Sequence, residues 1–323
     1  MSLPLLLAGA VLVALNAYVL LGGADFGGGV WDLFAAGPRA RGQRELIAHA
    51  IGPIWEANHV WLILAIVLLF VCFPVAFARL SVVLNIPLTL ALFGIVLRGA
   101  AFAFRSYGGD RDAVQLRWGR VFAVASLTTP LLLGTAFGAL ASGAVGSWSN
   151  DPPRAFAAAY IAPWLTPFGV GVGLLTLACF AYLAAVYLTL EADDRQLSED
   201  FRSRALLAGV VVLVVGGPPM MSATPGSLVI GVATVAAAVA WWALWTRRYR
   251  LARVAAAGQV SCVIWGWALR QFPYVLPPSL TIEAAAAPAP TLQLVLAALA
   301  LGVVVLVPSL AYLFNVFKGE AKR

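Results

Sequence analysis

A few ionisable and polar side chains interrupt otherwise apolar stretches of this sequence, and their types suit proton transfer. Asp25 follows the first apolar run in GGADFGGGVWD, Glu56 lies in IGPIWEANHVWLIL, and Arg98 lies in IVLRGAAFAFR. Asn58 and His59 follow closely, and the i, i+3 spacing of Glu56 and His59 suits the passage of a proton along one helix face. Chains of Asp, Glu and His at membrane depth commonly form proton relays. These five residues are therefore the candidate site.

The elements that position these side chains are predicted to be membrane-spanning helices. Of the 323 residues, 62% are hydrophobic and only 11% are charged, whereas soluble domains carry roughly a quarter charged residues. The apolar runs are about 18 residues or longer, as a helix crossing a hydrocarbon core of roughly 30 Å requires. None alternates as the strands of a membrane barrel do. The composition excludes a soluble globular protein and predicts an all-α polytopic membrane protein.

Apolar runs bounded by charges, Pro and Gly predict about nine transmembrane helices. They form a single integral membrane domain, residues 1–323, with approximate halves 1–150 and 151–323. The expected spans are near 3–24, 50–78, 80–104, 119–142, 162–190, 204–221, 226–246, 254–270 and 291–316. Most of the 21 Lys and Arg residues lie in the connections after odd-numbered spans. By the positive-inside rule, the N-terminus is outside and the C-terminus is cytoplasmic. The net charge of +7 thus indicates topology and not a nucleic-acid partner.

This topology places Asp25, Glu56 and Arg98 at a similar depth, toward the cytoplasmic ends of three consecutive helices. At 1.5 Å per residue, each lies within about two turns of its helix end, and we expect the three side chains to touch. Two interpretations stay open at this point. One is a structural ion-pair network that sets how the helices dock, and the other is a proton pathway that opens to the cytoplasm.

The glycine-rich segment GGADFGGG is expected at the end of the first span. It lacks the Gly-Lys-Ser/Thr ending of a phosphate-binding loop. Glycine lets helices approach one another closely, because no side chain separates the two backbones. We therefore expect this segment to mark close helix–helix or backbone packing.

Few residues of this chain could hold a redox cofactor. Only two histidines are present, His49 and His59, fewer than a haem–copper centre or a bis-histidine haem bundle requires. The three cysteines lie inside apolar runs without a CxxC pattern. No metal or cofactor site is therefore expected in this chain. The alternative is that His59 serves as a lone haem ligand. Trp55 and Trp61 flank the Glu56 segment. They are weak candidates for residues that pack near the site.

Four segments, spread from the first predicted span to the last, are similar to a known family. They are GADFGGGVWDLF (23–34), IGPIWEANHVWLILAIVLLFVCFPVAFA (51–78), LRGAAFAFR (97–105) and FPYVLPPSLTIEAAAAPAPTLQLVL (272–296). The second is similar to the family pattern Gly-Pro-Val-Trp-Asp-Gly-Asn-Glu-Val-Trp-Leu. Over essentially its whole length, the chain resembles subunit II of the cytochrome bd-type quinol oxidases.

The resemblance implies a heterodimer with a subunit I that carries haems b and d. Such a complex oxidises quinol and reduces oxygen to water. The implied fold is two four-helix bundles plus a peripheral helix, in a multi-pass protein of the bacterial inner membrane. Further implied partners are small single-helix accessory subunits, membrane lipid and quinone. Subunit II of this family has no haem ligands. It stabilises subunit I and, in some members, contributes a proton route, an oxygen route or a structural quinone site.

The resemblance also implies roles for the site residues. The family's acidic residue falls on Glu56, its asparagine on Asn58 and its early aspartate on Asp25. The family's glutamate is replaced by His59, whose unperturbed pKa is near 6.5 against about 4.3 for Glu. Glu56 is the expected proton relay, assisted by His59 and Asn58. Asp25 is expected near the cytoplasmic entrance, with Arg98 as the counter-ion.

Two other functions are compatible with these residues. A proton-coupled secondary transporter could use the same carboxylates, although the repeats and broken helices typical of such proteins are not apparent in the sequence. A purely structural scaffold for a haem subunit would need no conducting path. An oxidase subunit should co-purify with a haem-containing partner, whereas a transporter would not.

Overall fold

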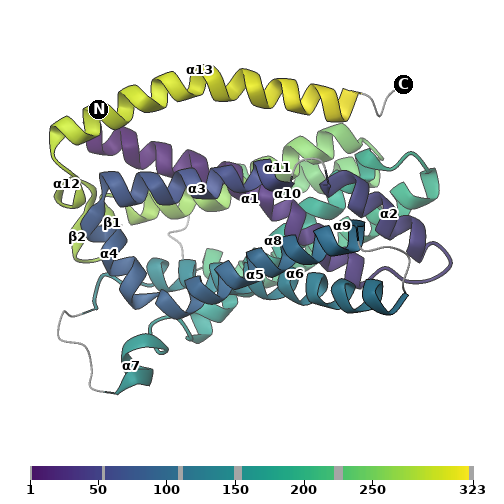
Figure 1. The fold of residues 1–323 in the computed structure, drawn as a ribbon, viewed down its shortest axis with the longest axis horizontal. Helices are drawn as coiled ribbons and strands as arrows, with labels where there is room; N and C mark the ends of the chain where they lie inside the picture. The colour runs from purple at the N-terminus through teal and green to yellow at the C-terminus, as the bar shows by residue number, and fades with distance from the viewer. Residues whose placement is uncertain (1, 53–54, 108–111, 149–154, 222–227, 320–323) are drawn as a thin grey trace.

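The chain folds almost entirely into helices that run along the long axis of the molecule (Figure 1). The computed structural model describes residues 2–52, 55–107, 112–148, 155–221 and 228–319. The long helices are α1 (Leu3–Leu33), α3 (Trp55–Cys72), α5 (Asn85–Tyr107), α6 (Asp112–Ala141), α8 (Pro167–Glu191), α9 (Arg195–Met221), α10 (Leu228–Trp245), α11 (Tyr249–Gln271) and α13 (Ala289–Gly319). The shorter elements are α2 (Ala40–Ile51), α4 (Pro74–Val83), α7 (Phe156–Tyr160), α12 (Ile282–Ala285), and the antiparallel pair β1 (Tyr274–Leu276) and β2 (Leu280–Thr281).

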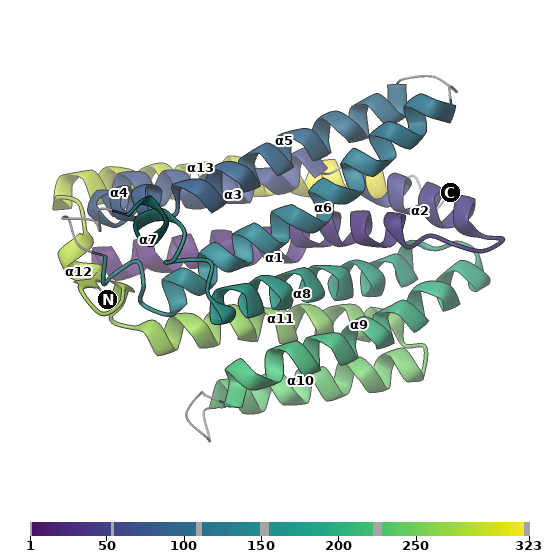
Figure 2. The same ribbon diagram turned by 90° about the horizontal axis from the view of Figure 1, so that it is seen from below.

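Helices α1 and α8 lie side by side at the centre and join two groups of helices (Figure 2). On one side, α1 contacts α3 and α6, and α5 packs on α6. On the other, α8 contacts α9 and α11, and α10 packs on α11. Helix α13 lies on the outside, where it contacts α1 and α3 (Figure 1). The site residues on α1, α3 and α5 therefore belong to the first group.

Within the described residues, seven helices are long and apolar enough to cross a membrane, so the chain is an integral membrane protein. They are α1, α3, α5, α6, α8, α10 and α13. The spans predicted at 204–221 and 254–270 fall in α9 and α11. These two helices begin with the charged sequences RQLSEDFRSR and YRLAR, which shorten their apolar stretches. The count of nine spans stays a prediction.

Two predicted helix boundaries are wrong. Helix α1 continues past residue 24 to Leu33, so the glycine-rich segment lies inside the helix and not at its end. The predicted span 50–78 is divided, because α3 ends at Cys72 and α4 begins at Pro74. Proline has no N–H to donate to the preceding turn, so it favours the first turn of a new helix.

The glycines of α1 allow its backbone to lie directly against α8, which confirms the close packing expected of this segment. A Cβ atom built on Gly27 would overlap the backbone oxygen of Phe180, and one on Gly23 would overlap the Phe180 ring. A backbone oxygen cannot move aside as the end of a flexible side chain can. Only glycine therefore fits at Gly27.

Replacing Gly27 with leucine is expected to lower the thermal stability of the purified protein strongly. Overpacking typically costs about 1–3 kcal/mol, and a clash with backbone belongs at the upper end of that range. Thermal unfolding in detergent measures the effect. Gly9→Leu is the matched control on the same helix, because nothing lies within 4 Å of a Cβ at Gly9. Equal melting temperatures for the two variants would contradict this account.

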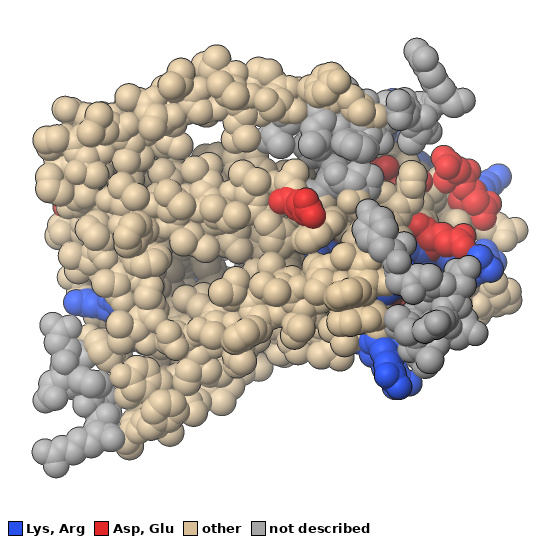
Figure 3. All heavy atoms as spheres, viewed as in Figure 1, with Lys and Arg blue, Asp and Glu red and all other residues tan. Residues whose placement is uncertain are grey.

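Charged side chains gather at the end of the molecule that holds α2 and the connection between α8 and α9 (Figure 3). We call this the charged end. Most of the remaining surface in this view carries no charged side chain. A largely uncharged belt with charges concentrated at one end suits a membrane protein whose loops on one side are basic.

Candidate functional site

Asp25 and Asn58 form a buried hydrogen-bonded pair between α1 and α3. Their exposed fractions are 4% and 1%, and Nδ2 of Asn58 donates to Oδ2 of Asp25 at 2.8 Å. A buried carboxylate requires such bonds, because it has lost its hydration. Asp25 lies eight residues before Leu33, the end of α1, which places the pair about 12 Å from the charged end of that helix.

Arg98 of α5 completes this buried group. It is 2% exposed, and its Nη2 donates to the backbone oxygen of Asp25 at 2.8 Å. The guanidinium lies 4.7 Å from the ring centroid of Phe26 and 5.1 Å from that of Phe122. Asp25 is near enough to stabilise its charge, as a buried cation requires. The structure thus brings together Asp25, Asn58 and Arg98, which we call the Asp25 cluster.

His59 lies in an aromatic cage beside the Asp25 cluster. The ring centroids of Tyr18, Phe26 and Trp55 lie 5.8, 6.0 and 6.0 Å from that of His59. Nδ1 of His59 is 2.9 Å from the backbone oxygen of Trp55, so Nδ1 carries a hydrogen and donates it. In the described chain, Nε2 of His59, the Tyr18 hydroxyl and Nε of Arg98 are buried without a hydrogen-bond partner. Internal water is the usual partner for such atoms.

Glu56 does not join the Asp25 cluster, and the expectation that its side chain touches Asp25 and Arg98 is wrong. Glu56 is exposed on the outer face of α3. Among the described residues, none forms a hydrogen bond or ion pair with it. The reason is helical geometry: Glu56 and Asn58 are two residues apart, about 200° around the helix, so they point in nearly opposite directions.

The two tryptophans of α3 serve packing. The Trp55 indole lies on Gly99 of α5, where a Cβ would meet it at 2.9 Å, and its ring centroid is 6.3 Å from that of Phe102. Trp61 packs against the buried rings of the Phe26 and Phe180 cluster. Both residues hold α3 in place beside the site. Among the described residues, neither forms a hydrogen bond with a charged group of the site.

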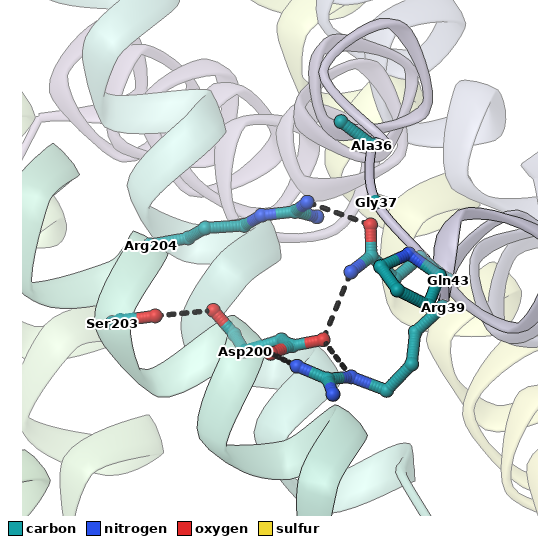
Figure 4. A pocket seen from close by; sticks show the side chains of 8 residues that line it. Ala36, Gly37, Arg39, Gln43, Asp200, Ser203 and Arg204 are labelled. Carbon is teal, nitrogen blue, oxygen red and sulfur yellow. Dashed lines mark hydrogen bonds and ion pairs between the residues drawn. The ribbon is translucent and has the colours of Figure 1, made fainter.

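A polar network at the charged end ties the connection between α1 and α2 to α9 (Figure 4). Nη2 and Nε of Arg39 donate to Asp200 at 2.6 and 2.8 Å, and Nε2 of Gln43 donates to the same carboxylate at 2.9 Å. Nη2 of Arg204 donates to Gln43 at 2.7 Å. These residues line an open cavity of about 290 Å³. In the sequence, these arginines indicate only the topology, and no motif predicts the network that they form.

A second missed contact pairs Asp32 of α1 with Arg105 of α5. The two N–O distances are 3.1 and 3.2 Å, and Asp32 is 6% exposed. Asp32 lies near the end of the motif GADFGGGVWDLF, and the basic Arg105 ends LRGAAFAFR. The opposite charges near the ends of these two motifs are the signal in the sequence that could have predicted the pair. The bidentate pair fixes α5 against the end of α1.

Glu199 is the centre of another cluster at the charged end. It accepts hydrogen bonds from Arg247 at 2.6 Å, from Arg202 at 2.7 Å and from Tyr249 at 3.2 Å. The hydrogen bond from Arg247, with that from Arg202, lowers the pKa of the Glu199 carboxyl from its ordinary value of 4.5 to about 2. The cluster joins the start of α9 to the turn between α10 and α11.

This lowered pKa predicts an acid-sensitive stability. Because the folded pKa is below the unfolded one, the stabilisation is full above pH 4.5 and is lost as the pH falls toward about 2. Melting temperatures are measured at pH 5 and at pH 2.5. The decrease in melting temperature between the two should therefore be smaller for Glu199→Gln than for the parent protein. Glu45→Gln, at a more exposed ion pair, should keep the steep dependence. A Glu199→Gln profile as steep as the parent's would contradict the assignment.

The donor groups of this chain do not fit a haem. His49 is exposed on α2 at the charged end, and His59 is enclosed by the rings of Tyr18, Phe26 and Trp55, which pack around it. In the residues that the structure describes, no three His, Cys, Asp or Glu side chains are grouped so that they could hold a metal ion.

Sequence comparison decides the family. The family described as cytochrome bd terminal oxidase subunit II matches residues 3–317. This chain belongs to that family. The resemblance noted from the four motifs is thereby confirmed, and the match covers every residue of the Asp25 cluster as well as Glu56.

Individual relatives agree with the family match. Cytochrome bd-I ubiquinol oxidase subunit 2 of Escherichia coli (strain K12) is 27% identical over 213 residues, 65% of this chain and 53% of that protein. Cytochrome bd ubiquinol oxidase subunit 2 of Bacillus subtilis (strain 168) is 27% identical over 207 residues, 64% and 58% of the two chains. The matched region thus spans about half the length of these curated relatives.

A solved structure shows the same fold. The bd oxidase from Geobacillus thermodenitrificans contains a chain that superposes with a TM-score of 0.75 at 20% identity, over 98% of this chain and 99% of that one. At this identity the likeness concerns the fold. The helical arrangement around α1 and α8 is therefore shared with a bd oxidase.

Proposed function

We propose that this chain is the non-haem subunit II of a cytochrome bd-type quinol:oxygen oxidoreductase in the bacterial inner membrane. Family membership and the names of the relatives support this assignment. In the proposed complex, quinol is oxidised and oxygen is reduced at a subunit I that holds haems b and d. This chain stabilises subunit I and conducts protons toward it. Small single-helix subunits, lipid and quinone are further proposed partners.

The observation that carries this proposal is the outward position of Glu56. A charged side chain at membrane depth costs about 2.5–3.5 kcal/mol even on the lenient insertion scale. No described residue of this chain compensates Glu56. A neighbouring polypeptide with polar groups removes the cost. The same helix face continues with the exposed apolar residues Val60, Ile63, Val67 and Phe70, and we call this stripe with Glu56 the α3 face.

The basic residues support an orientation with the charged end in the cytoplasm, the N-terminus outside and the C-terminus inside. In this orientation, protons enter near the Asp25 cluster. His59 follows Glu56 by three residues on α3, and its ring contacts Phe26 and Tyr18 of α1. His59 therefore connects the buried cluster with the α3 face. Glu56 delivers the proton to subunit I, and Arg98 is the counter-ion of Asp25.

Purification under mild detergent tests the assignment. An affinity-tagged chain should co-purify with a haem-containing polypeptide, and the preparation should show visible absorption bands and quinol-dependent oxygen consumption. A proton-coupled transporter would instead be colourless and self-sufficient. Recovery of this chain alone, folded and without bound haem protein, would contradict the proposal.

A further inference from the structure

A small cavity with polar groups in its inner and outer parts connects the Asp25 cluster with the charged end. It has a volume of about 70 Å³ and lies between α1, α2, α3, α8 and α11. Asp25 and Asn58 line its inner part, whereas Tyr187, Glu191 and Arg253 line the part near the end of α8. The buried site thus has an opening within this chain, with polar side chains in its inner and outer parts.

The outer part of the cavity is built from two charged groups and an aromatic ring. Nη1 of Arg253 lies 3.5 Å from Oε1 of Glu191, and the two side chains are 39% and 28% exposed. The guanidinium also lies over the Tyr187 ring, 4.8 Å from its centroid. Glu191 is the last residue of α8. Its carboxylate therefore meets bulk water on one side and the cavity on the other.

The cavity has the size and chemistry to hold water. Its lining on α8 runs from Ala184 to Glu191, seven residues or about 10 Å along the helix. At about 30 Å³ per water molecule, its volume accommodates about two waters. Carboxylate, amide, hydroxyl and guanidinium groups can each hydrogen-bond to them, and the remaining walls are small or apolar residues such as Ala24, Gly28 and Ala50.

We propose that this cavity is a water-filled proton inlet and that Glu191 is the carboxylate that collects protons for Asp25. A proton bound by Glu191 passes through the cavity water to Asp25, and Glu191 is then reprotonated from solvent. Arg253 is a positioning residue that orients Glu191 and Tyr187. The inlet rests on the proposed function, since it supplies the path that ends at Glu56.

The test measures proton uptake by the whole oxidase complex in lipid vesicles. Oxygen is added to the reduced complex, and a pH-indicating dye follows proton consumption on the side of the charged end. Glu191→Gln is nearly isosteric and should slow proton uptake at least about 10-fold. Loss of an acid–base group typically costs 10²–10⁴-fold, and the effect here is smaller because water partly replaces the lost carboxylate. Glu191→Asp should restore most of the rate. Ala50→Leu, which fills the cavity, should slow uptake without changing any charge.

Two readouts separate the inlet from a structural role. In Glu191→Gln, uptake should fall more steeply with rising pH, and added acetate should restore it, because a small acid can enter the open cavity in place of the lost carboxyl. Among the described residues that line the cavity, the charged and titratable groups that share it with Glu191 are Arg253 from α11, Tyr187 on α8 and Asp25 from α1. Glu45→Gln, at an exposed ion pair outside the cavity, is the matched control and should take up protons at the parent rate.

The outcomes also distinguish the inlet from the proposed function. Normal uptake in both Glu191→Gln and Ala50→Leu, with slow uptake in Glu56→Gln, would overturn the inlet and leave the path to Glu56 in place. Normal uptake in all three variants would overturn both. Slow uptake in Glu191→Gln that acetate does not restore, at full haem content, would likewise overturn Glu191 as the collecting group.

Discussion

Replacing Glu56 with alanine is expected to reduce quinol oxidase turnover at least about 100-fold, the lower bound for loss of a positioned acid–base group. The substitution removes the exposed carboxylate of the α3 face, through which protons are proposed to reach subunit I. Glu56→Asp keeps a titratable group one methylene shorter and should retain most of the turnover. Oxygen consumption per mole of haem measures the effect independently of expression level.

Haem content separates the conducting role of Glu56 from a scaffold role. If Glu56 only holds the partner subunit, Glu56→Ala should lose bound haem protein while the complexes that remain turn over normally. If it conducts protons, assembled complexes should retain haem but turn over slowly. Glu45→Ala, at an exposed pair with Arg41, is the control. Full turnover of Glu56→Ala at normal haem content would remove the proton assignment.

Arg98→Met is expected to destabilise the protein by about 3–5 kcal/mol, as removal of one partner of a buried charge pair does. The change leaves Asp25 buried without the guanidinium that lies beside it. The double variant Arg98→Met with Asp25→Asn should recover part of this loss, because both charges are then absent. Thermal unfolding of the four proteins gives the coupling.

Additive losses in this cycle would show that Arg98 and Asp25 are energetically independent, against the proposed counter-ion role. Arg98→Lys provides a further comparison. It keeps the positive charge but cannot reproduce the planar guanidinium between the rings of Phe26 and Phe122. Its stability should therefore fall between that of the parent and that of Arg98→Met.

The depth of the site residues along their helices could be predicted from the sequence, but the face of each helix that points inward could not. Counting residues from the charged loops predicts Asp25, Glu56 and Arg98 at one level, and the structure joins Asp25 to Arg98 and to Asn58. Glu56 lies near the same level, yet it points outward because two residues separate it from Asn58. The outward-pointing Glu56 has a role only if a partner subunit contacts it, and no sequence pattern within this chain describes that partner.

Other parts of the fold depend on contacts between distant segments. The hydrogen bond of Trp31 to the backbone of Ala181, at 2.7 Å, and the tight fit at Gly27 exist only once α8 lies against α1. They compensate the low helix propensity of the glycines, so α1 extends beyond its predicted end. Similarly, Arg39 and Asp200 are 161 residues apart, and their pairing follows from the docking of α9.

Site-directed crosslinking at position 56 tests most directly whether another polypeptide covers the α3 face. A photoreactive reagent attached to Glu56→Cys, in a background without Cys72, Cys179 and Cys262, is activated in native membranes. We expect a covalent adduct between this chain and a haem-containing polypeptide, and no such adduct in the cysteine-free protein. Adducts with lipid alone, in membranes that contain the assembled complex, would contradict it.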